Sequence, residues 1–197
     1  HQYKHKGIKM EDIIFFDLEV NRKSQAIEDI GAVFNGQEFH DRSPGEFSKF
    51  LEQSDLLCGH NIINHDLPVL EKTSLKNSLS GKLFIDTLYL SALLFAEKPY
   101  HHLVKDYKIF RGEAESNDPL IDSKLCRELF LDELAKFNSL PETLKMIYTS
   151  MLAEQEAFRG FFKIIGAGKY DDLPYLIRSY FKERMCSQAS LEPMLND

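Results

Sequence analysis

Residues 12–19, Asp-Ile-Ile-Phe-Phe-Asp-Leu-Glu, constrain the fold of this chain more than any other segment. Their β-branched and aromatic side chains are typical of a buried strand, and the strand pattern runs directly into Asp17 and Glu19. Because side chains alternate between the two faces of a strand, Asp17 and Glu19 point the same way, and like charges repel unless a cation lies between them. The pair therefore indicates a divalent-metal site. An isolated Asp-x-Glu is more often two solvated acids past a strand end, so this interpretation depends on the rest of the chain.

The composition is that of a folded globular protein, since 43% of the 197 residues are hydrophobic and 15 are Phe. The apolar runs are far shorter than the roughly 20 residues that a membrane span needs, so we expect no membrane partner. Three widely spaced cysteines argue against a disulfide framework or a cysteine zinc site and favour an intracellular, cytoplasmic protein. The net charge of −7 argues against a broad nucleic-acid-binding surface but allows a local site where bound metals reverse the field.

The pattern along the chain predicts four segments. Residues 1–10 are polar and basic and indicate a tag remnant, a linker or a mobile arm. Residues 11–137 predict a domain with strands at about 12–17, 26–34, 37–40, 56–58 and 82–85 and helices at about 44–51, 64–70, 88–95 and 120–135. Residues 138–185 predict a helical extension that ends with a helix at 173–181, and residues 186–197 predict a tail or truncated linker.

Two more acids fall in the first turns of expected helices. Pro68 is tolerated only in a first turn, so a helix from about Asn64 places Asp66 there, and Pro119 does the same for Asp122. An isolated Asp at such a position most often only complements the helix dipole. Asp86, at the end of the strand at 82–85, is expected to cap the helix that follows.

Together these motifs resemble the DEDD superfamily of 3′–5′ exonucleases, the proofreading and RNase T type. The first motif corresponds to Phe15 to Glu19, the second to Gly59-His60-Asn61-Ile62 ending in His65-Asp66, and the third to the segment around Asp122. Ile85-Asp86-Thr87 matches the family's fourth strand and its cap. The resemblance covers residues 12 to about 136, and three motifs in the right order are a stronger signal than any one alone.

The resemblance implies an α/β, ribonuclease-H-like three-layer fold with a mixed five-stranded sheet whose second strand is antiparallel, followed here by C-terminal helices. It also implies that two divalent cations, Mg or Mn, are held by Asp17, Glu19, Asp66 and Asp122. Two cations close together need this many acids if positions are to stay open for water and phosphate.

One position departs from the family pattern. Where the family branch with a histidine base places that residue, five positions before the last Asp, this chain has Asn117. An amide cannot accept a proton at neutral pH, so another group takes the role, the metals act without a base, or activity is low. His101 stands five residues before Asp106 and offers a second match to the third motif, but the helix after Asp122 has the family's apolar pattern.

The expected function is a metal-dependent 3′–5′ exonuclease that hydrolyses single-stranded DNA or RNA ends to 5′ mononucleotides. The alternative is a catalytically weakened domain for nucleic-acid binding or docking. Contacts to the strand are expected from Asn61, Lys105, Lys108 and Arg111, although a solvated helix end and loop is an equally good interpretation of the three basic residues. The second motif with Asn117 also resembles exonuclease-like domains joined to helicases of the RecQ type, which implies a covalently linked helicase in a larger DNA-processing protein.

Overall fold

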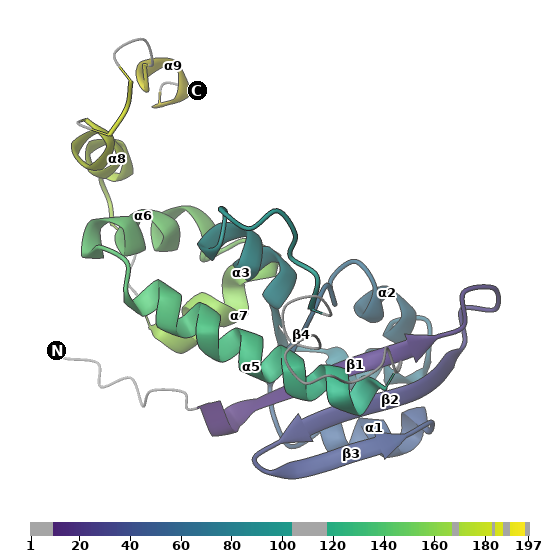
Figure 1. Ribbon diagram of the computed structural model, residues 1–197. Coiled ribbons are helices and arrows are strands. Elements are labelled where there is room, and N and C mark those ends of the chain that lie inside the picture. Colours follow the sequence, from purple (N-terminus) through teal and green to yellow (C-terminus); the bar gives the residue numbers. More distant parts are fainter. Residues whose placement is uncertain (1–9, 104–117, 167–169, 183, 187–189, 196–197) are drawn as a thin grey trace, which may run out of the picture.

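The computed structural model describes residues 10–103, 118–166, 170–182, 184–186 and 190–195 (Figure 1). Asn117, Lys105, Lys108 and Arg111, to which the sequence assigns site roles, lie outside these residues, as does Asp106.

The described residues form an α/β fold around one mixed five-stranded sheet in the order β3-β2-β1-β4-β5. The strands are β1 Ile13–Val20, β2 Ile27–Phe34, β3 Gln37–Asp41, β4 Leu56–Gly59 and β5 Leu83–Asp86. β2 is antiparallel to β1 and to β3, whereas β4 is parallel to both β1 and β5. This is the ribonuclease-H-like arrangement that the resemblance implies, with the antiparallel second strand in place.

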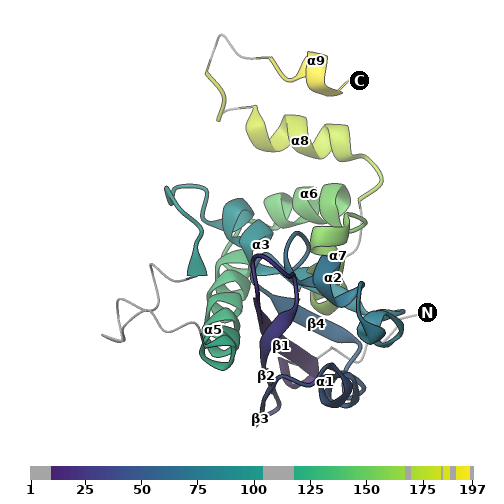
Figure 2. The same cartoon turned by 90° about the vertical axis from the view of Figure 1, so that its right-hand side faces the viewer.

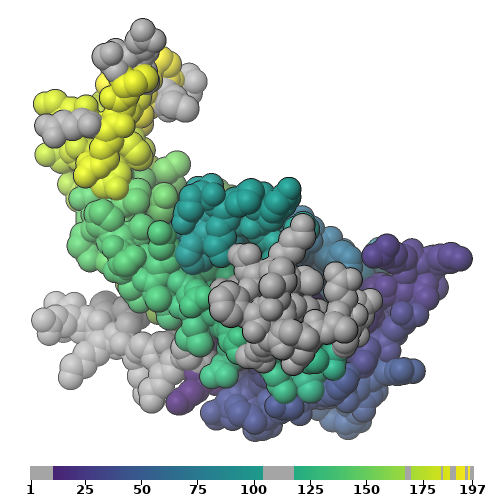
Figure 3. All heavy atoms as spheres, viewed as in Figure 1, coloured from purple at the N-terminus to yellow at the C-terminus, as the bar shows by residue number. Residues whose placement is uncertain are grey.

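Helices cover both faces of the sheet and make three layers (Figure 2). One face carries α1 Pro44–Leu51, α2 Asp66–Leu70 and the 3₁₀ helix η2 Ser74–Leu79; the other carries α3 Thr87–Leu94, α5 Pro119–Asn138 and α7 Glu156–Ile165. A 3₁₀ turn, η1 Met10–Asp12, precedes β1. The chain continues through α6 Glu142–Leu152, α8 Leu173–Phe181 and α9 Glu192–Leu195, and Figure 3 shows α8 and α9 projecting from the rest of the molecule.

The sheet has a hydrophobic core on each face, and the side chains of β1 alternate between these two cores. Ile13 and Phe15 are buried against α3, α5 and α7, while Ile14, Phe16 and Leu18 are buried against α1, α2 and η2. A strand buried on both faces reads as a continuous hydrophobic run, as residues 13–16 do. Asp17 and Glu19 continue the row of Ile13 and Phe15, so they face the α5 layer.

Most predicted elements are confirmed, including the helix Leu173–Phe181. The predicted strands at 26–34 and 37–40 pair as β2 and β3, joined by a turn at Asn35-Gly36. The prediction for α2 was two residues early, since the helix begins at Asp66 after the N-cap residue His65, whose side chain makes no capping hydrogen bond. The 3₁₀ helix η2 lies between the predicted helix and the next predicted strand, and the expected tail contains the short helix α9. Among the described residues, no helix is both long enough and apolar enough to cross a membrane.

The helical extension contributes to the main core through α7. Phe161 and Phe162 of α7 are buried in the same cluster as Phe15 and Phe130. A Cβ atom on Gly160 would lie 2.4 Å from the carbonyl oxygen of Phe84, so only glycine lets α7 approach β5 this closely. α7 thus packs directly against the last strand of the sheet.

Candidate metal centre

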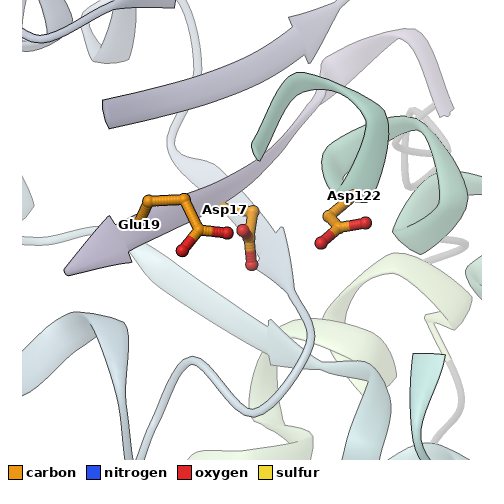
Figure 4. A group of neighbouring side chains, drawn as sticks. All are labelled: Asp17, Glu19 and Asp122. Atoms are coloured by element: carbon orange, nitrogen blue, oxygen red, sulfur yellow. The ribbon is translucent and has the colours of Figure 1, made fainter. Parts of the chain in front are cut away.

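Three carboxylates meet above the C-terminal half of β1. Asp17 and Glu19 come from β1 and Asp122 comes from α5; one carboxylate oxygen of each lies within 4.8 Å of the others. Figure 4 shows the three side chains converging, and all three are partly buried. Carboxylate oxygens at this spacing are the ligands that Mg²⁺ and Mn²⁺ prefer.

The start of α5 places Asp122 over the strand acids. Asp118 caps the helix by accepting hydrogen bonds from the backbone N–H groups of Leu120 and Ile121, and Pro119 occupies the first turn. This first turn lies against Gly31 of β2, which is the cross-strand partner of Asp17. Asp122, one turn into the helix, therefore projects toward Asp17.

Asp66 lies beside the three-carboxylate group rather than within it. Its side chain is only 2% exposed, and backbone N–H groups of Leu18 and of Asp66 itself donate to the carboxylate. β4 pairs with β1 only as far as Phe15, so Asp66 satisfies a β1 N–H group beyond the last residue paired with β4. Its other oxygen, Oδ1, is buried without a hydrogen-bond partner in the described part of the chain. Such an oxygen is costly unless a cation or a proton satisfies it.

Burial and mutual repulsion favour the protonated form of Asp17 and Asp66. Desolvation raises the pKa of Asp17 well above its usual value, and the charges of Asp66, Asp122 and Glu19 raise it further. Desolvation also raises the pKa of Asp66 to about 8, although the two backbone hydrogen bonds lower it, and the charges of Asp86 and Glu19 add smaller increases. A group of acids that opposes its own ionisation gains most from a divalent cation, which reverses the local field.

Asp86 organises the loop that leads to Asp66. As predicted, it caps α3, accepting from the Leu88 N–H. Its two oxygens also accept from the backbone N–H groups of Asn61 and Ile63, at 2.9 and 3.1 Å. These bonds fix Asn61 in the left-handed region at φ 62°, a conformation that asparagine tolerates. Asn61, predicted to contact substrate, lies in this turn, partly exposed.

Two groups near the site were not singled out from the sequence. Asp29 lies directly opposite Glu19 across the β1–β2 pair, and the His40 ring nitrogen Nε2 lies 2.9 Å from its carboxylate. Tyr89 of α3 accepts a hydrogen bond from the side chain of Asn64. The alternation of side chains along β2 would place Asp29 on the face of Glu19 once the register of the two strands is known. The contact of Tyr89 with Asn64 depends on the tertiary fold and has no sequence signal.

One cavity lies apart from the four acids. A cavity of about 540 Å³ opens near the start of β1 and the β2–β3 hairpin, lined by residues that include Glu11, Phe34, Lys124 and Arg127. Asp17, Glu19, Asp66 and Asp122 do not line this cavity.

A comparison with protein-family models and with curated protein sequences found no match to this chain.

Proposed function

We propose that this chain is a two-metal-dependent 3′–5′ exonuclease domain that hydrolyses single-stranded nucleic-acid ends to 5′ mononucleotides. The observation that carries the proposal is the convergence of Asp17, Glu19 and Asp122, with the buried and unpartnered Oδ1 of Asp66 beside them. A structural role does not explain four acids gathered where each raises the cost of ionising its neighbours.

The residues fit a pair of divalent cations. Asp17, Glu19 and Asp122 would supply ligand oxygens from two elements, and Asp66 a fourth from α2. Bound Mg²⁺ or Mn²⁺ supplies a nucleophile from water at neutral pH and stabilises the charge on the leaving oxygen. The chain's own task is to hold these four acids in position, through β1, the start of α5 and the Leu18 N–H bond to Asp66.

A second candidate is a catalytically weakened domain that binds or docks nucleic acid, and the sequence departure at Asn117 favours it. An amide there cannot serve as a general base, which is usually worth about 10²–10⁴ in rate. Both candidates fit a domain that acts within a larger helicase-type protein on a single-stranded 3′ end.

A nuclease assay separates the two candidates. Single-stranded DNA and RNA labelled at the 5′ end are incubated with the protein in Mg²⁺, Mn²⁺ or chelator, and products are resolved at single-nucleotide steps. We expect stepwise shortening that chelator abolishes. Asp17→Asn and Asp122→Asn are expected to lose cleavage while remaining folded, because one lost ligand leaves the cations under-coordinated.

Asp132→Asn is the matched control, since Asp132 is an exposed acid on the same helix as Asp122. It is expected to cleave at the wild-type rate. Near-normal cleavage by Asp17→Asn would contradict the exonuclease proposal, and metal-independent strand binding without cleavage would support the second candidate.

A further inference from the structure

We propose that Tyr89 and Asn64 form the surface on which an unpaired base at the 3′ end of the substrate stacks beside the metal centre. The inference rests on the proposed function, because it names how the same site holds its substrate. It assigns Tyr89 the stacking face and Asn64, with Asn61, the polar contacts to the edge of the base.

Both side chains lie at the edge of the sheet that carries the acids. β1, β4 and β5 are parallel, so their C-terminal ends lie at one edge. Tyr89 belongs to the first turn of α3, directly after β5, and Asn64 belongs to the loop after β4, two residues before Asp66. The Asn64 amide nitrogen Nδ2 lies 3.2 Å from the Tyr89 hydroxyl, which joins the two segments next to Asp66.

The Tyr89 ring is exposed yet held in place. The residue is 36% exposed, one of few large apolar side chains that reach solvent among the residues the structure describes. Its ring packs edge to face on Phe158 of α7, with centroids 6.2 Å apart and planes at 78°, while the Asn64 bond fixes its hydroxyl. A ring fixed at both ends loses little freedom when a base stacks on it, which favours binding.

The asparagines leave polar atoms toward solvent beside the ring. Asn64 Nδ2 also donates to Asn61 Oδ1 at 3.0 Å, and Asp86 holds the backbone of this turn. Within the described part of the chain, Asn61 Nδ2 and Asn64 Oδ1 make no hydrogen bond, so one donor and one acceptor are available. A base edge offers matching groups only when it is unpaired, and we therefore expect single-stranded ends to bind better than blunt duplex ends.

The test is the affinity of the full chain for a 5′-labelled ten-nucleotide thymidine strand in Ca²⁺, measured by fluorescence anisotropy. A second strand carries abasic sites at its last two 3′ positions. Tyr89→Ala is expected to weaken binding of the intact strand roughly 5- to 150-fold, as loss of one stacked base does, and to leave binding of the abasic strand unchanged. Tyr89→Phe keeps the ring and is expected to stay within about threefold of wild type, since a rim hydrogen bond contributes little.

Tyr175→Ala is the matched control, because Tyr175 is 60% exposed on α8, away from the sheet edge. It should bind both strands as wild type does. Equal loss on both strands, or loss by Tyr89→Phe as large as that of Tyr89→Ala, would show a structural role and overturn the proposal.

The same measurements separate this inference from the proposed function. If the wild type cleaves in Mg²⁺ and Tyr89→Ala binds the intact strand normally, the base-stacking surface is wrong and the exonuclease stands. If the wild type binds the strand with the expected Tyr89 dependence but never cleaves it, the exonuclease is wrong and the base-stacking surface stands. Absence of any binding by the wild type overturns both.

Discussion

Gly31 lies so close under the first turn of α5 that a Cβ atom on it would come within 2.0 Å of the Leu120 backbone nitrogen. Gly31 is the cross-strand partner of Asp17, and Leu120 precedes Asp122 by two residues. This close backbone approach therefore helps to set the separation between the acids of β1 and the acid of α5.

We predict that Gly31→Ala damages both the fold and the metal centre. Forcing a methyl group between two backbones pushes α5 away, which should cost about 1–3 kcal/mol of unfolding free energy. Mn²⁺ affinity should fall as Asp122 withdraws, and both effects can be measured by urea unfolding and metal titration. Gly45→Ala is the control: Gly45 lies inside α1 and a Cβ there meets nothing nearer than the Ser43 Oγ at 3.8 Å. It should be neutral or stabilising, and wild-type Mn²⁺ affinity in Gly31→Ala would refute the prediction.

Local signals were enough to predict the strands and the elements that carry the four acids, whereas the mixed sheet was implied by the family resemblance. The hydrophobic run of β1, the Asn35-Gly36 turn and the proline at the start of α5 each depend on a few neighbouring residues. The convergence of Asp17 with Asp122 was implied by the family resemblance and follows in the structure from the Gly31 contact, which no local pattern reveals.

The features that could not be predicted depend on tertiary contacts. Helix α2 starts without a side-chain cap at His65, and the first residue of the helix, Asp66, accepts a hydrogen bond from the Leu18 N–H group of β1. The pairing of Asp29 with His40 requires the register of three strands. The approach of α7 to β5 depends on Gly160, whose close contact has no signature in sequence.

The metal-free protein should lose stability as pH rises. Folding raises the pKa of Asp66 to about 8 and that of Asp17 above its usual value, so the folded state binds more protons than the unfolded state in this range. The stability that these two acids contribute is fully present below about pH 4 and is lost as pH rises toward their folded pKa values, by about 1.36 kcal/mol for each pKa unit that separates the two states. Thermal unfolding in chelator between pH 5 and 8 measures this slope.

Saturating Mn²⁺ should reverse that trend, because cations compete with protons for the same oxygens and bind better as pH rises. In Asp66→Asn the decline with pH in chelator should be smaller. A metal-free melting temperature that rises from pH 5 to 8 would contradict the assignment of these buried acids.

The residue at position 117 should limit the rate. We predict that Asn117→His raises exonuclease activity and adds a titration near the histidine pKa of about 6.5 to the pH–rate profile, since imidazole can accept a proton there and an amide cannot. Asn138→His, at the far end of α5 from Asp122, is the control and should leave the profile unchanged. If Asp106→Asn abolishes cleavage and Asp122→Asn does not, the third motif belongs at Asp106 and His101 takes the role of base.

The buried carboxyl group of Glu133 in α5 should destabilise the folded protein, and by more as pH rises. The residue is fully buried, and neither carboxylate oxygen has a hydrogen-bond partner among the described residues. Desolvation raises its pKa well above the usual value, Cys126 and Asp86 add to the rise, and Lys98 opposes it. The folded state therefore keeps this proton, so stability from Glu133 is fully present below about pH 4.5 and is lost as pH rises toward the folded pKa.

Replacing Glu133 by leucine removes the buried polar group from a site among apolar side chains, and we expect it to stabilise the protein at pH 8 by about 1–3 kcal/mol and by less at pH 5. Glu133→Gln keeps the shape but not the titration, so its stability relative to wild type should also improve between pH 5 and 8. Urea unfolding at both pH values with saturating Mg²⁺ isolates this effect from that of the metal-centre acids. Glu71→Gln, at an exposed position after α2, should track the wild type at both pH values. If Glu133→Leu is less stable than wild type at pH 8, the prediction is wrong and the carboxyl group makes a favourable interaction in the folded protein.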